Sequence, residues 1–175
     1  MTAAAPLDNF ANENLPDKSR WPDLLFELPE LNYPEQLNAC VELLDKQIAR
    51  GYGERTALRN AAIHWSYSEL AAKVAQIAHV LQQDYQIIPG NRVLLRGSNH
   101  PMFAACILAI WRIGAIAVPS MPLLRAKELS NIIEKAQISH ALCAHDLRAE
   151  LELVQSPFLK KIAYFNSADL ELALE

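Results

Sequence analysis

Four short, continuous apolar runs in the second half of the chain constrain its fold more than any other feature. They cover residues 93–95, 115–118, 141–144 and 162–165. Segments with helical periodicity near 101–113, 125–136 and 146–154 separate them. Strands covered on both faces carry continuous apolar runs, and helices between such strands connect them in parallel. The pattern therefore predicts an α/β fold: a parallel sheet layer of βαβ units with flanking helices.

Residues 1–36 differ from the rest of the chain, because they are rich in Pro and Asn and contain only isolated apolar side chains. This composition indicates an extended N-terminal arm and places the start of the α/β unit, residues 37–175, after it. The α/β unit begins with a helix predicted over 37–50, ending at Gly51. Its apolar face follows helical spacing and consists of Leu37, Cys40, Val41, Leu44 and Ile48.

Two strand-like runs, 56–59 and 63–66, precede a second predicted helix that extends to about Gln83. Ser66 and Glu69 match the S-x-x-E capping box at its start, in which each side chain accepts a hydrogen bond from an otherwise unpaired backbone N–H. At the later helix 101–113, Ser98 or Asn99 is the predicted N-cap, and Pro101 fits the first turn. Arg112 could bind an anion, but an arginine in an apolar helix more often buries its stem and extends its head to water, which is what we expect here.

Charge and composition exclude several classes of protein. The 16 basic and 20 acidic side chains give a net charge of −4, with no cluster of Lys and Arg to bind nucleic acid or an anionic membrane. The longest apolar run, 102–111, is shorter than the roughly 20 residues that span a bilayer. The N-terminal sequence lacks the basic start and apolar core of a signal peptide, so we expect a cytoplasmic protein.

Motifs for phosphate, acyl or metal chemistry are missing from the sequence. Its five glycines form neither G-x-x-x-x-G-K-[ST] nor G-x-G-x-x-G, and no G-x-S-x-G occurs. The histidines and the three cysteines lack the spacing of metal ligands, and the odd cysteine count argues against a disulfide framework. We therefore predict no catalytic residue and no metal ligand in this chain.

Two stretches nevertheless resemble the adenylate-forming (AMP-binding) acyl-CoA synthetase superfamily. WSYSEL, residues 65–70, is similar to the family's T-Y-x-E-L signature, and PGNRVLLRGSNHPMFAACILAIWRIGAIAVPSMPLLRAKEL, residues 89–129, to its G-D-R-V … G-A … P-x-x-P block. Asn91 stands where Asp is usual, and no acidic residue follows Asn99. The arm and the stretch 120–139 most resemble the benzoate and 2-aminobenzoate (anthranilate) CoA ligase branch.

The resemblance implies a parent reaction in which an aromatic carboxylate and ATP form an acyl-adenylate, and CoA then takes the acyl group. The family uses ATP, Mg²⁺ and CoA, and its phosphate loop and catalytic lysine follow the region matched here. We therefore expect an N-terminal fragment that acts as a scaffold, binds none of these cofactors alone and has the remaining ligase domains as partners. Arg148 is close to the position of an arginine that binds CoA phosphate in some members; an ordinary exposed arginine is the alternative.

Two other functions stay open at this point. One is a stand-alone, non-catalytic binding module of the same fold. The other is a fragment of a different adenylate-forming enzyme, such as an acyl-AMP ligase or an amino-acid adenylation domain. Helix 101–113 is apolar nearly all round, so an uncovered face would promote self-association.

Overall fold

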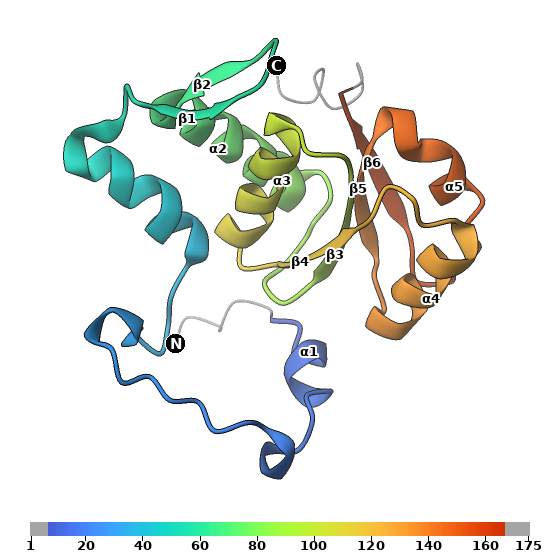
Figure 1. Cartoon of the computed structure of the whole chain (residues 1–175). Coiled ribbons are helices and arrows are strands. Elements are labelled where there is room, and N and C mark those ends of the chain that lie inside the picture. The colour runs from blue at the N-terminus through green and yellow to red at the C-terminus, as the bar shows by residue number, and fades with distance from the viewer. Residues whose placement is uncertain (1–6, 167–175) are drawn as a thin grey trace.

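A four-stranded parallel sheet forms the centre of the computed structural model, which describes residues 7–166 (Figure 1). The strand order is β4-β3-β5-β6. The strands are β3 (Arg92–Arg96), β4 (Ile116–Ser120), β5 (His140–Ala144) and β6 (Lys161–Phe165). All pairs are parallel. The predicted α/β class is confirmed, and each of the four apolar runs lies within one of the strands or begins one residue before it.

Helices cover both faces of this sheet. One face packs against α2 (Tyr67–Gln83) and α3 (Pro101–Arg112). The other packs against α4 (Ala126–Ala136) and α5 (Arg148–Glu152), and the single turn η5 (His145–Leu147) precedes α5. The first core lies between the sheet and α2 and α3, and the second core between the sheet and α4 and α5. Val93 and Leu95 of β3 point into the first core, and Leu94 points into the second. All three are fully buried, which explains the continuous apolar run.

The middle of α3 lies in the first core. Its buried face consists of Met102, Ala105, Cys106, Ala109 and Ile110, and α2 supplies a covering layer on it. Phe103, Ile107 and Trp111 remain partly exposed at its margin. The predicted helix 101–113 is thus buried along one face rather than all round.

The chain before α2 forms a helical segment and a hairpin. Wide π-helical turns, η3 (Val41–Asp45) and η4 (Ile48–Tyr52), occupy the predicted helix, and Gly51 adopts a left-handed φ of 84° near its end. Strands β1 (Thr56–Arg59) and β2 (His64–Ser66) then pair antiparallel. The predicted capping box at the start of α2 is present: Ser66 Oγ accepts from Glu69 N at 3.2 Å, and Glu69 Oε2 from Ser66 N at 2.8 Å.

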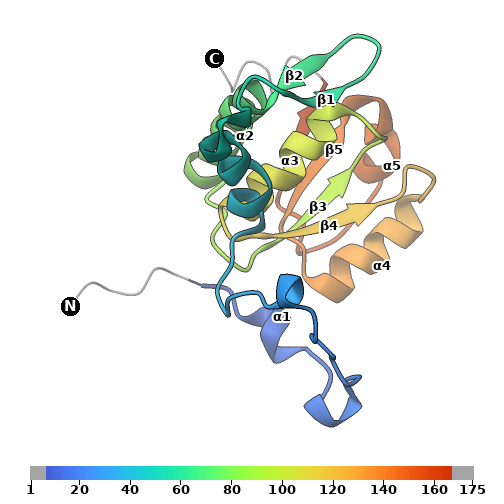
Figure 2. The same ribbon diagram turned by 60° about the vertical axis from the view of Figure 1, so that its left-hand side comes forward.

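The arm is the least packed part of the described chain (Figure 2). It contains α1 (Phe10–Glu13) and two single turns, η1 (Lys18–Arg20) and η2 (Pro29–Leu31). Residues 12–30 are all exposed. The predicted boundary between the arm and the α/β unit at residue 36 stays a prediction. The start of the arm, 1–6, and the end of the α/β unit, 167–175, lie outside the described residues.

Asn38 connects the arm to the body. Its Oδ1 accepts from the backbone N–H of Cys40 at 3.0 Å and so caps the helical segment that follows. Its Nδ2 donates to the carbonyl oxygens of Trp111 and Arg112, at 3.0 and 3.2 Å, at the end of α3. One side chain thus satisfies unpaired backbone groups of two helix ends.

Candidate functional site at the carboxyl edge of the sheet

The carboxyl ends of β3 and β5 form the candidate site. These neighbouring strands lead into helices on opposite faces of the sheet, since α3 belongs to the first core and α5 to the second. Open α/β sheets bind ligands in the crevice where the connections diverge in this way. The topology therefore selects this edge before any side chain is considered.

Gly97 lies directly after β3, and two aromatic rings pack against its backbone. A Cβ at this position would lie 2.7 Å from the ring of Phe103 and 2.8 Å from that of Phe165. Phe165 ends β6 and is 1% exposed. The inner part of the crevice is therefore filled by protein, and any ligand must bind further out, among the loops.

Arg96 holds those loops in place through hydrogen bonds to their backbone. Its side chain is buried, with 1% of the residue exposed, and its guanidinium donates to four backbone carbonyl oxygens. Those of Met121, Pro122 and Leu124, after β4, accept at 2.9 Å, and that of Leu147, after β5, accepts at 3.2 Å. Sequence patterns did not predict this role of Arg96. Its signal was a cation directly after the continuous apolar run 93–95, in a strand that is buried throughout, Arg92–Arg96.

A hollow of about 240 Å³ opens beside Arg96. Leu123 and Leu124 contribute apolar surface, and Arg125, Asp146 and Glu150 contribute charge. Arg125 Nη1 lies 3.2 Å from Glu150 Oε1, and the other carboxylate oxygen accepts from Ala126 N at 2.9 Å. The second hydrogen bond satisfies a backbone donor in the first turn of α4, so Glu150 ties α5 to the start of α4.

Arg148 lies close to this hollow but not in its lining. The residue is exposed, and its Nη1 donates to the carbonyl oxygen of His145 at 3.1 Å. Its Nε lies 3.9 Å from Glu152 Oε1. An exposed guanidinium with these weak local partners can turn toward a ligand at small cost in free energy. The contact of Arg148 with CoA phosphate stays a prediction.

The predicted N-cap of α3 is wrong. His100, not Ser98 or Asn99, caps the helix, with its Nδ1 accepting from Met102 N at 3.1 Å. Pro101 occupies the first turn as predicted and has no N–H. The imidazole takes the position because it lies directly before Pro101, while Ser98 and Asn99 are further back in the turn. Few N–H groups at this helix end remain free for a phosphate.

Arg112 has a partner that the sequence did not predict. Its Nη1 lies 3.1 Å from Asp45 Oδ1, and about a third of each side chain is exposed. Asp45 lies on the helical segment that Asn38 caps, so only the tertiary fold brings this partner to Arg112. The partly exposed guanidinium thus reaches water, as expected, and also forms an ion pair that the sequence did not predict.

The three cysteines are buried and free. Desolvation raises the pKa of Cys106 to about 12, and it is the main cause that raises the pKa of Cys143 to the same value. Such thiols are not nucleophiles at neutral pH. Within residues 7–166, no group of three or more His, Cys, Asp or Glu side chains could hold a metal ion, and no helix there is long and apolar enough to cross a membrane.

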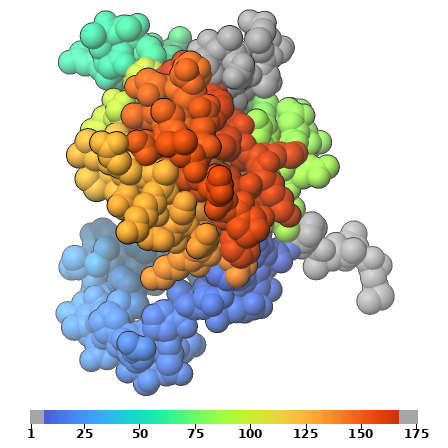
Figure 3. Space-filling model, turned by 90° about the vertical axis from the view of Figure 1, so that its right-hand side faces the viewer, coloured from blue at the N-terminus to red at the C-terminus, as the bar shows by residue number. Residues whose placement is uncertain are grey.

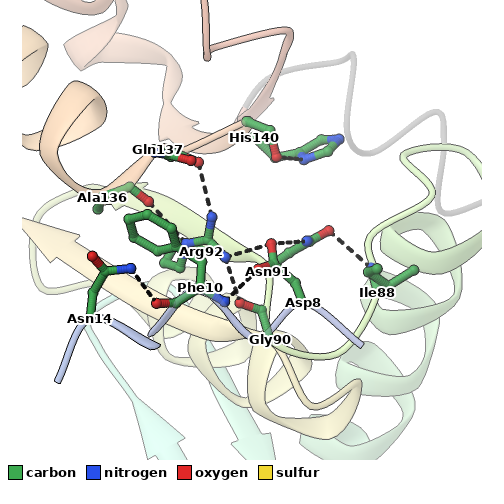
Figure 4. A network of polar contacts seen from close by, with 11 residues as sticks. Asp8, Phe10, Asn14, Ile88, Gly90, Asn91, Arg92, Ala136, Gln137 and His140 are labelled. Atoms are coloured by element: carbon green, nitrogen blue, oxygen red, sulfur yellow. Dashed lines mark hydrogen bonds and ion pairs between the residues drawn. The ribbon is translucent and has the colours of Figure 1, made fainter. Parts of the chain in front are cut away.

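The opposite, amino edge of the sheet anchors the arm (Figure 4). Arg92 donates through Nη1 to Asp8 Oδ2 and to the carbonyl oxygen of Gly90, and through Nε to that of Ala136 at 2.9 Å. The centre of the Phe10 ring lies 4.6 Å from the guanidinium carbon of Arg92. Gly90 is essential here, because it has a φ of 84° and a Cβ would collide with the carbonyl of Asp8.

Comparison with known proteins identifies the fold and the family. The family model described as "AMP-binding enzyme" matches residues 45–172. The chain belongs to this family. It is 32% identical over 162 residues to the 2,3-dihydroxybenzoate-AMP ligase of Bacillus subtilis (strain 168), which covers 89% of this chain and 30% of the relative. It is 30% identical over 105 residues to a 3-hydroxybenzoate/4-hydroxybenzoate CoA ligase of Thauera aromatica, covering 60% and 20%.

Solved structures of AMP-binding enzymes share the fold. The anthranilate CoA ligase AuaEII in complex with anthranoyl-AMP superimposes with a TM-score of 0.71 at 19% identity, over 77% of this chain and 26% of that one. A fatty acyl CoA synthetase of Mycobacterium tuberculosis gives 0.70 at 20% identity, over 77% and 28%. These likenesses agree with the parallel sheet and flanking helices described above.

The predicted resemblance to adenylate-forming aryl-acid ligases is therefore confirmed at the level of the family. The relatives include AMP ligases, CoA ligases and a synthetase subunit, so family membership alone leaves the acyl acceptor open. The chain spans 30% and 20% of the two curated relatives named above.

Proposed function

We propose that this chain is the N-terminal scaffold of an aryl-CoA ligase. The parent enzyme would join an aromatic carboxylate to ATP in the presence of Mg²⁺, release pyrophosphate and pass the acyl group to CoA. The similarity to a 2,3-dihydroxybenzoate-AMP ligase over 89% of the chain supports the activation of an aromatic acid with ATP, and the names of two CoA ligases support CoA as the acceptor. The hydroxybenzoate CoA ligase and the fold shared with an anthranilate CoA ligase agree with it.

The residues at the carboxyl edge do not fit the phosphates of ATP. Pro101 removes one donor from the first turn of α3, and His100 already accepts from Met102 N. Phosphoryl and adenylyl transfer need several preorganised donors and a positioned cation. We therefore assign the chain a supporting role: Arg96 holds the loops after β4 and β5 in place beside a site completed by other residues.

CoA contact would involve Arg148. An exposed guanidinium at the start of α5 has the charge and reach to bind a phosphate group. A cytoplasmic location fits the proposed need for ATP and CoA. The remaining ligase domains would be the partners of this chain, and an aromatic acid the substrate of the parent enzyme.

A second candidate is an aryl-AMP ligase that transfers its acyl group to a carrier protein or another acceptor. The relative matched over most of this chain carries that kind of name, which favours this alternative. The two candidates share the adenylation step and differ only in the acceptor.

Carboxylate-dependent ATP–pyrophosphate exchange tests the scaffold role. The purified 175-residue chain should show no exchange with benzoate, 2-aminobenzoate or 2,3-dihydroxybenzoate, and robust exchange would contradict the proposal.

The encoding frame downstream of Glu175 should contain a loop similar to T-S-G-T-T-G-x-P-K, and a stop codon directly after Glu175 would overturn the ligase proposal. CoA-dependent release of AMP by the longer product separates the two candidates.

A further inference from the structure

Residues 21–35, here called the strap, expose an unusual number of large apolar side chains. Leu24, Leu25, Phe26 and Leu28 are 58%, 74%, 59% and 61% exposed. The same segment contains four carboxylates and no basic residue: Asp23, Glu27, Glu30 and Glu35. An exposed apolar segment with charges of one sign is typical of a docking element.

The arm that contains the strap is anchored to the body on both sides. Asp8 binds Arg92 at the amino edge of the sheet, and Asn38 binds the carbonyl oxygens of Trp111 and Arg112 at the end of α3. Between these anchors the arm projects away from the body (Figure 3). The anchors limit the freedom of the strap, which lowers the entropy cost when it binds a partner.

A matching hollow of about 280 Å³ lies at the opposite end of α3. Its apolar surface comes from Leu58 of β1 and from Phe103 and Ala104 of α3. Arg59 adds a guanidinium group and His100 an imidazole. Among residues 7–166, no carboxylate lines it. The hairpin β1–β2 beside this hollow and the strap lie at opposite ends of the molecule in Figures 1 and 2.

Net charge agrees with this pairing. The α/β unit, residues 37–175, contains fourteen Lys and Arg and thirteen Asp and Glu side chains, whereas the strap contains four carboxylates and no basic residue. Two straps facing one another would repel, which argues against a symmetric contact between them. A contact between the strap of one molecule and the body of another brings opposite charges together.

We propose that the strap of one copy docks in this hollow of a second copy. Leu25 and Phe26 enter the apolar part, and Asp23 and Glu27 face Arg59. The contact is head-to-tail, so every added copy leaves one free strap and one free hollow, and association continues into longer assemblies or a closed ring. It does not depend on the ligase proposal.

Analytical ultracentrifugation of the full chain tests the docking. The wild-type mass should rise with protein concentration and fall with added salt, because the contact includes surface charges. Leu25→Asp/Phe26→Asp (strap variant) and Arg59→Glu/Ala104→Glu (hollow variant) should each lower the association constant at least about tenfold, as expected for loss of central contacts. Leu153→Asp, an equally polar change at a residue 68% exposed elsewhere, should leave it unchanged.

Mixing the two variants provides the decisive measurement. The strap variant keeps a working hollow and the hollow variant a working strap, so a mixture should form a 1:1 complex that stops at the mass of a dimer. Circular dichroism confirms that both variants are folded. A wild-type chain that is monomeric at all concentrations, association unaffected by both variants, or a mixture that stays monomeric would each overturn the proposal.

Discussion

Asp8 and Arg92 form an ion pair between residues 84 positions apart, which attaches the N-terminal arm to the amino edge of the sheet. The Arg92 side chain is 8% exposed and that of Asp8 24%. Asn91 Nδ2 donates to the same carboxylate oxygen at 2.9 Å, and Phe10 N donates to the other at 3.0 Å. Three donors thus converge on one carboxylate.

The first prediction concerns the pH dependence of this pair. Burial alone would raise the pKa of Asp8, but the hydrogen bonds from Phe10, Arg92 and Asn91 outweigh it and lower the pKa. A lowered folded-state pKa stabilises the fold above the unfolded value of about 3.9, and the gain disappears as the pH falls through the folded pKa. Asp8→Asn should cost about 1–2 kcal/mol at pH 7 in urea unfolding. Its cost should shrink toward pH 3, and a cost independent of pH would contradict this account.

The second prediction compares two glycines with the same backbone angle. Gly51 and Gly90 both have a φ of 84°, but only at Gly90 would a Cβ meet another atom, the carbonyl of Asp8. Gly51→Ala should cost only the left-handed strain of about 1–2 kcal/mol. Gly90→Ala should cost more and also detach the arm. Urea unfolding measures the loss of stability in both variants, and faster proteolysis within residues 1–36 measures detachment of the arm. Equal stability losses and equal proteolysis rates in the two variants would refute this prediction.

A third prediction addresses Arg96. Arg96→Met leaves buried carbonyl oxygens after β4 and β5 without a donor, so we expect a loss of about 3 kcal/mol in the free energy of unfolding. Hydrogen exchange should increase in residues 121–125 and 145–148. Arg125→Met is the matched control, because its side chain is 79% exposed and its ion pair contributes at most about 1 kcal/mol. Similar losses in both variants would show that the buried network does not hold the loops.

The fourth prediction separates the observed cap of α3 from the one predicted from the sequence. His100→Ala removes the acceptor for Met102 N and should destabilise the protein by about 0.5–2 kcal/mol. Ser98→Ala and Asn99→Ala change exposed side chains and should stay within about 0.5 kcal/mol. Thermal unfolding of the three variants measures their stabilities. A larger loss of stability for Ser98→Ala than for His100→Ala would contradict the observed cap.

Local patterns predicted the regular elements well. The apolar runs located all four strands of the parallel sheet, and Ser66 and Glu69 located the start of α2. Such signals depend on neighbouring residues, because strand burial and helix capping are determined within a few positions of the chain. The family resemblance came from the same stretches, so it too could be recognised without coordinates.

Polar partners across the fold were predicted much less well. The cap at His100 depended on the geometry of one turn, and the roles of Arg96 and Arg112 depended on loops and helices distant in the sequence. A charged side chain in an apolar segment indicates that a partner exists, but not which group provides it. For the two arginines, the physical reason is the separation of the partners by 25 or more residues.

The sequence by itself determined that this chain is a parallel α/β layer of the AMP-binding family, because hydrophobic periodicity and short framework motifs are local properties. Only the tertiary structure decided how Asp8 anchors the arm, how Arg96 holds the carboxyl-edge loops and where the strap and the basic hollow lie. Those relationships arise when distant segments pack together, and buried polar groups then bind whichever partners the topology brings within reach.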